Sequence, residues 1–202
     1  MSSDAETFDE DLDDVGYEFK DELKIRKVLE NHTDWDFEFT KSEQYQYDLT
    51  IYQWDDKPRT PADQHVIGYV ELERCRRDRD KSWVMGAVPE NWYYLSFLQR
   101  KVRDYDFDAQ SWQGLKNDYD RTVYLKFNHA MTNCFAAPIE AIYRDGTTTK
   151  RSDGGYNSTY LKLEKDHAAV EYGIQSCVSF IEDYLTRREA EQSNLLSWGM
   201  RL

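Results

Sequence analysis

The chain has 202 residues, of which 39 are acidic and 26 basic, so its formal net charge is −13. Apolar residues make up 40% of the chain and aromatic residues 15%, which excludes a disordered chain and is enough for a sizeable hydrophobic core. No apolar run approaches the roughly 18 residues that a membrane-spanning helix needs, and the acidic N-terminus lacks the apolar segment of a signal peptide. We therefore expect a soluble, cytoplasmic protein with no membrane partner.

The charge and the apolar residues divide the chain into three parts. Residues 1–16 contain seven acids and no base, roughly half of the net charge, and predict a solvated, flexible tail. Residues 17–191 predict a single α+β domain. Residues 192–202 include Leu195 and Trp198 and predict an apolar C-terminal tail, which must dock on this chain, on a partner protein or on a second copy of itself.

The predicted elements begin with a helix over 17–30, where apolar side chains recur at near-helical spacing. Alternating apolar and polar residues then predict strands at 34–41, 45–54, 66–74, 92–102, 122–129 and 133–143. The composition of 144–158 predicts a loop, and one apolar stripe predicts a helix over 168–191. This order predicts a mixed, mainly antiparallel central sheet flanked by an N-terminal and a C-terminal helix.

Strong catalytic motifs are absent from the sequence. Cys75, Cys134 and Cys177 are an odd, scattered set, which argues against a disulfide framework and against a structural zinc site. No glycine-rich phosphate loop, zinc-protease motif or nucleophile elbow occurs. The function must therefore be sought in a weaker pattern.

Carboxylates on two neighbouring predicted strands form such a pattern. Side chains of a strand alternate between its faces, so Glu71 and Glu73 share one face, and Asp48 joins them if the apolar faces of the two strands lie together. Three carboxylates at this spacing predict a Mg²⁺ site, with Mn²⁺ as a substitute, because these ions prefer oxygen ligands. The alternative is the wet face of an antiparallel sheet, where Asp, Glu and Thr are also common.

Basic residues follow the predicted strands 66–74 and 92–102 and predict a positive patch in an otherwise acidic chain. Interleaved Asp residues leave a solvated loop as the alternative. The patch would bind the phosphates of nucleic acid, DNA or RNA. The residues predicted to do so are Arg74, Arg76, Arg77, Arg79, Arg100 and Arg103. Lys101, or Arg100, would neutralise the charge that develops on the reacting phosphate.

The order helix, strand, strand, strand resembles the PD-(D/E)XK nuclease-like superfamily over about residues 17–103. The residues that carry this resemblance are Asp48 in YDLTIYQ and Glu71-Leu72-Glu73 in GYVELER. The resemblance implies a restriction-endonuclease-like core in which Asp48 and Glu71 bind the metal ion. Glu73 stands where most members have Lys, and it matches a variant that carries Glu there.

An acid on the preceding helix often completes the site in that superfamily, and Glu22 and Glu30 are the candidates here. The sequence departs from the superfamily pattern in three ways: no Pro precedes Asp48, the signature Lys is absent, and no helix is evident between the third and fourth strands. The pattern VELE, then Trp and Pro, then a strand ending in Arg100-Lys101, also looks like small uncharacterised phage-encoded proteins.

Three functions are compatible with these features. The first is a Mg²⁺-dependent nuclease, in which Asp48, Glu71, Glu73 and Lys101 are the catalytic residues and a metal-bound water attacks the phosphodiester. The second is a non-enzymatic structural or interaction protein of viral origin that keeps a nuclease-like fold, in the host cytoplasm. The third is an acidic mimic of nucleic acid that uses residues 1–16 against a DNA-binding protein.

Overall fold

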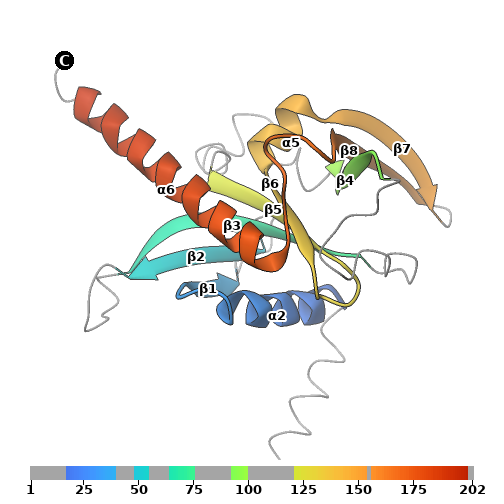
Figure 1. Cartoon of the computed structure of the whole chain (residues 1–202), viewed down its shortest axis with the longest axis horizontal. Coiled ribbons are helices and arrows are strands. Elements are labelled where there is room, and N and C mark those ends of the chain that lie inside the picture. Colours follow the sequence, from blue (N-terminus) through green and yellow to red (C-terminus); the bar gives the residue numbers. More distant parts are fainter. Residues whose placement is uncertain are drawn as a thin grey trace, which may run out of the picture.

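The computed structural model describes residues 17–39, 48–54, 64–75, 92–99, 121–153 and 156–199. The predicted acidic tail at 1–16 lies outside these ranges. Within them the chain forms two sheets and three helices, arranged in layers (Figure 1). None of the helices in these ranges is long and apolar enough to span a membrane.

The central sheet has six strands and confirms the predicted mixed, mainly antiparallel α+β architecture. Its strands in spatial order are β1 (Asp36–Phe39), β2 (Leu49–Trp54), β3 (Gln64–Arg74), β5 (Thr122–Phe127), β6 (Cys134–Pro138) and β9 (Glu171–Tyr172). Strand β3 pairs in parallel with β5, and the other pairs are antiparallel. The order helix, strand, strand, strand that the sequence predicts is therefore present as α2, β1, β2 and β3.

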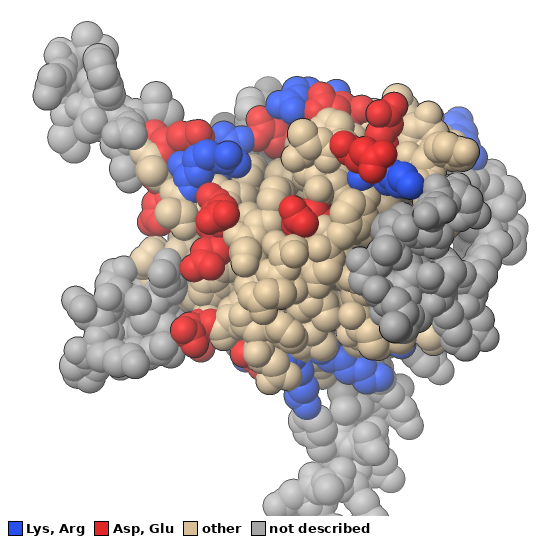
Figure 2. All heavy atoms as spheres, viewed as in Figure 1, with Lys and Arg blue, Asp and Glu red and all other residues tan. Residues whose placement is uncertain are grey.

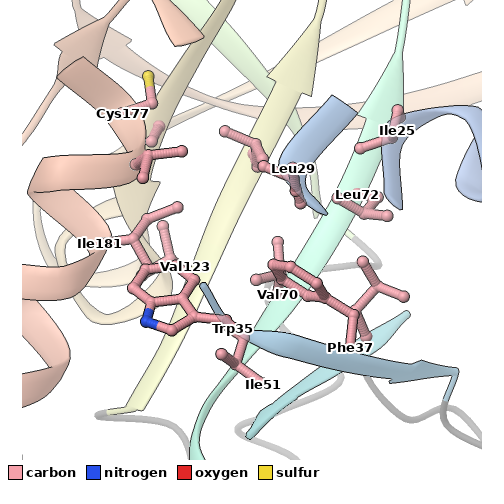
Figure 3. Close-up of a cluster of buried hydrophobic side chains, with 14 of the residues drawn as sticks. Ile25, Leu29, Trp35, Phe37, Ile51, Val70, Leu72, Val123, Cys177 and Ile181 are labelled. Atoms are coloured by element: carbon pink, nitrogen blue, oxygen red, sulfur yellow. The ribbon is translucent and has the colours of Figure 1, made fainter. Parts of the chain in front are cut away.

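Both long helices cover the same face of this sheet. Helix α2 (Tyr17–Glu30) begins and ends where the sequence predicts, and helix α6 (Ile174–Gly199) lies across β3 and β5 (Figure 1). Ile25 and Leu29 of α2 and Ile181 of α6 are buried in one cluster with side chains of β1, β2, β3 and β5 (Figure 3). Each aliphatic side chain buried in this way contributes about 1.5–3 kcal/mol to folding.

A second, smaller sheet covers the other face. Its strands in spatial order are β4 (Tyr94–Leu98), β8 (Tyr156–Glu164) and β7 (Thr147–Asp153). Leu95 and Phe97 of β4 pack against Tyr124 of β5 and Phe135 of β6, so a second hydrophobic cluster joins the two sheets. The predicted strand 92–102 is thus a strand over 94–98, but it pairs with β8 and not with the central sheet.

The prediction of one strand over 133–143 is wrong in its second half. Strand β6 ends at Pro138, which has no N–H to donate to a ladder, and helix α5 (Ile139–Asp145) follows directly. Ile139 and Ile142 are three residues apart and both are fully buried, so the helix turns one apolar side into the second cluster. The run of apolar residues therefore contains a strand followed by a helix. The spacing of the apolar residues alone does not show where one ends and the other begins.

The prediction of a loop over 144–158 is also wrong, because β7 and the first residues of β8 occupy it. The threonines at 147–149 have branched side chains that suit a strand. Strand β7 is at the edge of the small sheet and Thr147 and Thr148 are exposed, so its sequence is polar although its backbone is fully paired with β8.

The C-terminal helix begins later and ends later than the predicted range 168–191. Glu171 and Tyr172 pair with β6 as strand β9, and Gly173 adopts a left-handed φ of 86° before the helix begins at Ile174. Residues 192–199, which the sequence places in a separate apolar tail, continue helix α6.

Gly68 allows α6 to approach β3 closely. A Cβ atom at this position would lie 2.5 Å from Leu185 Cδ2 and 2.8 Å from the backbone oxygen of Arg121. Contacts this short require either the Leu185 side chain or the neighbouring backbone to move. The helix–sheet distance that builds the first cluster therefore depends on the absence of a side chain at Gly68.

We predict that Gly68→Ala lowers the free energy of unfolding by about 1–3 kcal/mol, because it overpacks the contact between β3 and α6. Chemical denaturation of the wild type, both single variants and Gly68→Ala/Leu185→Ala measures this. The cost of the alanine should be smaller in the Leu185→Ala background, since the shortened side chain leaves room for it. An equal cost in both backgrounds would contradict this explanation.

Candidate functional site

Strand β3 separates the hydrophobic core from a polar site. Val70 and Leu72 point into the cluster formed with α2 and α6. Tyr69, Glu71 and Glu73 alternate with them and face the second sheet, where Tyr69 packs against the second cluster. Glu71 is only 4% exposed, so its carboxyl group lies inside the protein.

Asp48 directly precedes β2 and contacts β3. Its carboxylate accepts a hydrogen bond from the backbone N–H of Leu72, with 2.6 Å between Oδ2 and the nitrogen. The β2–β3 register begins with the pair Leu49 and Val70, and its continuation by one residue would set Asp48 opposite Glu71. Directly opposite residues of an antiparallel pair have Cβ atoms about 5 Å apart on the same face. The Asp48 carboxylate is therefore bonded to the residue that directly follows Glu71.

Glu73 has different partners, on strand β5. Its Oε1 lies 2.6 Å from the Lys126 ammonium, and its Oε2 accepts a hydrogen bond from the Tyr124 hydroxyl. The parallel register places Tyr124 beside Glu71 and Lys126 beside Glu73. The Lys126 ammonium also donates to the backbone oxygen of Ser96 in β4, at 3.2 Å, and so links the two sheets.

The surroundings set the protonation of both β5 side chains. Burial, and then the neighbouring Glu73 carboxylate, raise the pKa of Tyr124 well above its ordinary value of 10.0, so its phenol remains a hydrogen-bond donor. Burial by itself lowers the pKa of Lys126, but the interactions with Glu73, together with smaller ones from Cys75 and Tyr160, raise the pKa above its ordinary value of 10.5. Lys126 is therefore positively charged at neutral pH.

The predicted basic patch is described only at its first residue. Arg74 donates from Nε and Nη2 to the backbone oxygen of His129, at 2.9 and 2.7 Å, and so ties the end of β3 to the turn after β5. The other predicted residues lie outside the described ranges: Arg76, Arg77, Arg79, Arg100, Lys101 and Arg103. On the face shown in Figure 2, acidic and basic side chains of the described residues are intermixed and form no continuous basic area.

The described residues contain no group of three or more Asp, Glu, His or Cys side chains that could hold a metal ion. The trio Asp48, Glu71 and Glu73 does not form such a group here, because both oxygens of Glu73 are turned to β5. Asp48 and Glu71 remain as two carboxylates with hard oxygen atoms, and the first is bonded to the residue that follows the second. This smaller set still suits Mg²⁺, which uses one or two carboxylates and completes its shell with waters and substrate phosphates.

The acids of helix α2 lie on the other side of the sheet from these carboxylates. Helix α2 packs through Ile25 and Leu29 on the face opposite Glu71. Glu30 is paired with Arg26 of the same helix, at 2.6 Å. Glu22, also on α2, is half-buried. The structure therefore does not bring either candidate acid next to the site.

Two polar residues of the site, Tyr124 and Lys126, are absent from the sequence-based prediction. They are spaced two apart in TVYLKF, as Glu71 and Glu73 are in VELE, so the alternation that singles out the carboxylates also marks them. The alternation alone does not show that these residues lie next to the carboxylates. Strand β5 is the neighbour of β3 in the sheet, although β4 comes between them in the chain, and strand order depends on the tertiary structure.

Neither a protein-family model nor a curated protein sequence matches this chain. Among solved structures, the chain is similar to that of D212, a nuclease from a fusselovirus. The two share 14% sequence identity with a TM-score of 0.40, and the match covers 85% of this chain and 92% of that chain. The chemistry of the site therefore has to be judged from the residues of this chain.

We predict that Tyr124→Phe lowers the free energy of unfolding by about 1–3 kcal/mol, because it removes a hydrogen bond to a charged, mostly buried acceptor and leaves the ring in place. Thermal or chemical denaturation at neutral pH measures the change. Tyr143→Phe is the matched control, since Tyr143 is 38% exposed. Equal stability of Tyr124→Phe and the wild type would show that the hydroxyl does not stabilise Glu73.

Proposed function

We propose that this protein is a metal-dependent nuclease, which hydrolyses phosphodiester bonds of DNA or RNA. The observation that supports this most is the position of Asp48, whose carboxylate bonds to the backbone N–H that directly follows Glu71. Two carboxylates, one buried on β3 and one just before β2, together with a mostly buried ammonium group suit phosphoryl chemistry better than they suit a purely structural sheet face.

In this proposal Asp48 and Glu71 hold Mg²⁺, for which Mn²⁺ can substitute. The bound ion would activate a water molecule and neutralise charge on the phosphate. The chain's own contribution is preorganisation. The Leu72 N–H fixes the direction of the Asp48 carboxylate, and burial between two sheets restricts Glu71. Neither group then has to be ordered when the metal ion and substrate arrive.

Charge also favours a cation at this position. The described residues of the site supply three carboxylates, from Asp48, Glu71 and Glu73, and one ammonium group, from Lys126. Carboxylates in a partly buried place attract a divalent cation, and the bound cation would in turn attract a phosphate. The nucleic-acid backbone would then be positioned by the predicted phosphate-binding residues Arg76, Arg77, Arg79, Arg100 and Arg103.

We predict that Asp48→Asn and Glu71→Gln each abolish stoichiometric binding of Mg²⁺ and Mn²⁺ and lower the cleavage rate about 100-fold or more. Calorimetry measures binding, and cleavage is measured on labelled single- and double-stranded DNA and RNA. Asn at position 48 keeps an oxygen that can accept the Leu72 N–H, so the variant removes the charge and preserves the local fold.

Glu164→Gln is the control, because Glu164 is exposed on β8. If the wild type binds no metal and cleaves none of the four substrates, the nuclease proposal is wrong. The non-enzymatic interaction protein then becomes the better explanation of the chain.

A further inference from the structure

We infer that Glu73 is a positioning residue and not a third metal ligand, and that it holds the Lys126 ammonium where the scissile phosphate meets Asp48 and Glu71. This inference rests on the proposed function. It assigns the role of the phosphate-binding cation to Lys126 of β5 and no longer to Lys101. Neither the sequence pattern nor the resemblance indicated Lys126.

The first reason is that both oxygens of the Glu73 carboxylate are already engaged. Lys126 binds one and the Tyr124 hydroxyl donates to the other. A metal ion at Glu73 would have to share these oxygens with a cation, or displace it, in a place where the Glu73 side chain is 17% and the Lys126 side chain 11% exposed. Removing one partner of a buried pair leaves an uncompensated charge, which is strongly unfavourable.

The second reason is that the ammonium of Lys126 has a donor to spare. An ammonium group carries three N–H donors. Within the described part of the chain, one contacts Glu73 and one contacts the Ser96 oxygen. A third donor therefore remains for a phosphate oxygen, and the two fixed partners restrict the directions in which it can point.

The third reason is the spacing along the sheet. The β3–β5 register pairs Glu71 with Tyr124 and Glu73 with Lys126. Lys126 is thus two residues further along than the position of Glu71, a rise of about 6.6 Å, on the same face. Its ammonium, held at Glu73, therefore lies on the face that carries Glu71 and a short distance along the sheet from it, which is where we place the phosphate.

The competing explanation is purely structural, since Lys126 also joins the two sheets through Ser96. In that case its variants would change stability without changing the chemistry of the folded protein. The test therefore needs measurements that a structural link does not affect. These are metal affinity, the separation of kcat from KM, and the salt dependence of nucleic-acid binding.

The variants are Glu73→Gln, Lys126→Gln and Lys126→Arg in the full chain, each checked for folding by thermal denaturation. Lys27→Gln is the matched control, because it removes the same charge from an exposed position on α2. Mg²⁺ and Mn²⁺ affinity is measured by calorimetry without nucleic acid. Cleavage of a labelled single-stranded oligonucleotide gives kcat and KM. Binding of the same oligonucleotide in EDTA is measured over a range of salt concentrations.

We expect Glu73→Gln to bind metal within about threefold of the wild type, whereas Glu71→Gln does not bind. Lys126→Gln should lower kcat about 100-fold with a much smaller change in KM, and Lys126→Arg should recover at least tenfold of that loss. In EDTA, Lys126→Gln but not Lys27→Gln should reduce the slope of log affinity against log salt by about 1.

Loss of metal binding in Glu73→Gln would overturn the positioning role, and the nuclease proposal would stand with three ligands. An unchanged kcat in folded Lys126→Gln would overturn the role of Lys126 alone. If the wild type neither binds metal nor cleaves, the nuclease proposal fails. The EDTA measurement then decides on Lys126, because an unchanged salt slope would show that its ammonium meets no phosphate.

Discussion

The parallel pairing of β3 with β5 is the constraint on which both the core and the site depend. On one face of this pair, Val70, Leu72, Val123 and Leu125 build the cluster that holds α2 and α6. On the other face, the same register sets Glu71 beside Tyr124 and Glu73 beside Lys126. A shift of one residue would exchange the two faces and bury carboxylates among the helices. The hydrophobic core therefore fixes the register that the polar site requires.

The second sheet gives this polar face its character. Phe97 of β4 packs edge-on against the Tyr124 ring, with the ring centroids 5.1 Å apart, and the Ser96 oxygen accepts from Lys126. Without that layer, the carboxylates would lie on a wet sheet face and their charges would be screened by water. With it, the electrostatic interactions among Glu73, Tyr124 and Lys126 act in a less polar medium and are stronger.

Placing the charges of Glu73 and Lys126 between two sheets is costly, and their ion pair offsets part of that cost. Replacing such a pair with apolar side chains of similar volume is often neutral or stabilising in other proteins. Glu71 is buried next to this pair, and Asp48 is hydrogen-bonded to the Leu72 N–H. In the proposed function, these two carboxylates are the preorganised charge that a metal ion would meet.

Local patterns in the sequence determined helix α2, the strand character of β1, β2, β3 and β5, and the shared face of Glu71 and Glu73. These features depend on side-chain periodicity, which a chain carries within a few residues. Only the tertiary structure decided that β5 lies beside β3 and that β4 pairs with β8 and not with the central sheet. It also decided that β7 pairs with β8, where the sequence predicts a loop. Pairing between distant segments depends on long-range burial and on backbone hydrogen bonds, which local periodicity does not report. The polar sequence of edge strand β7 and the change from strand to helix at Pro138 therefore show no periodic pattern that would predict them. The partners of Glu73 were decided in the same way, because Lys126 is far from it in the chain and next to it in the sheet.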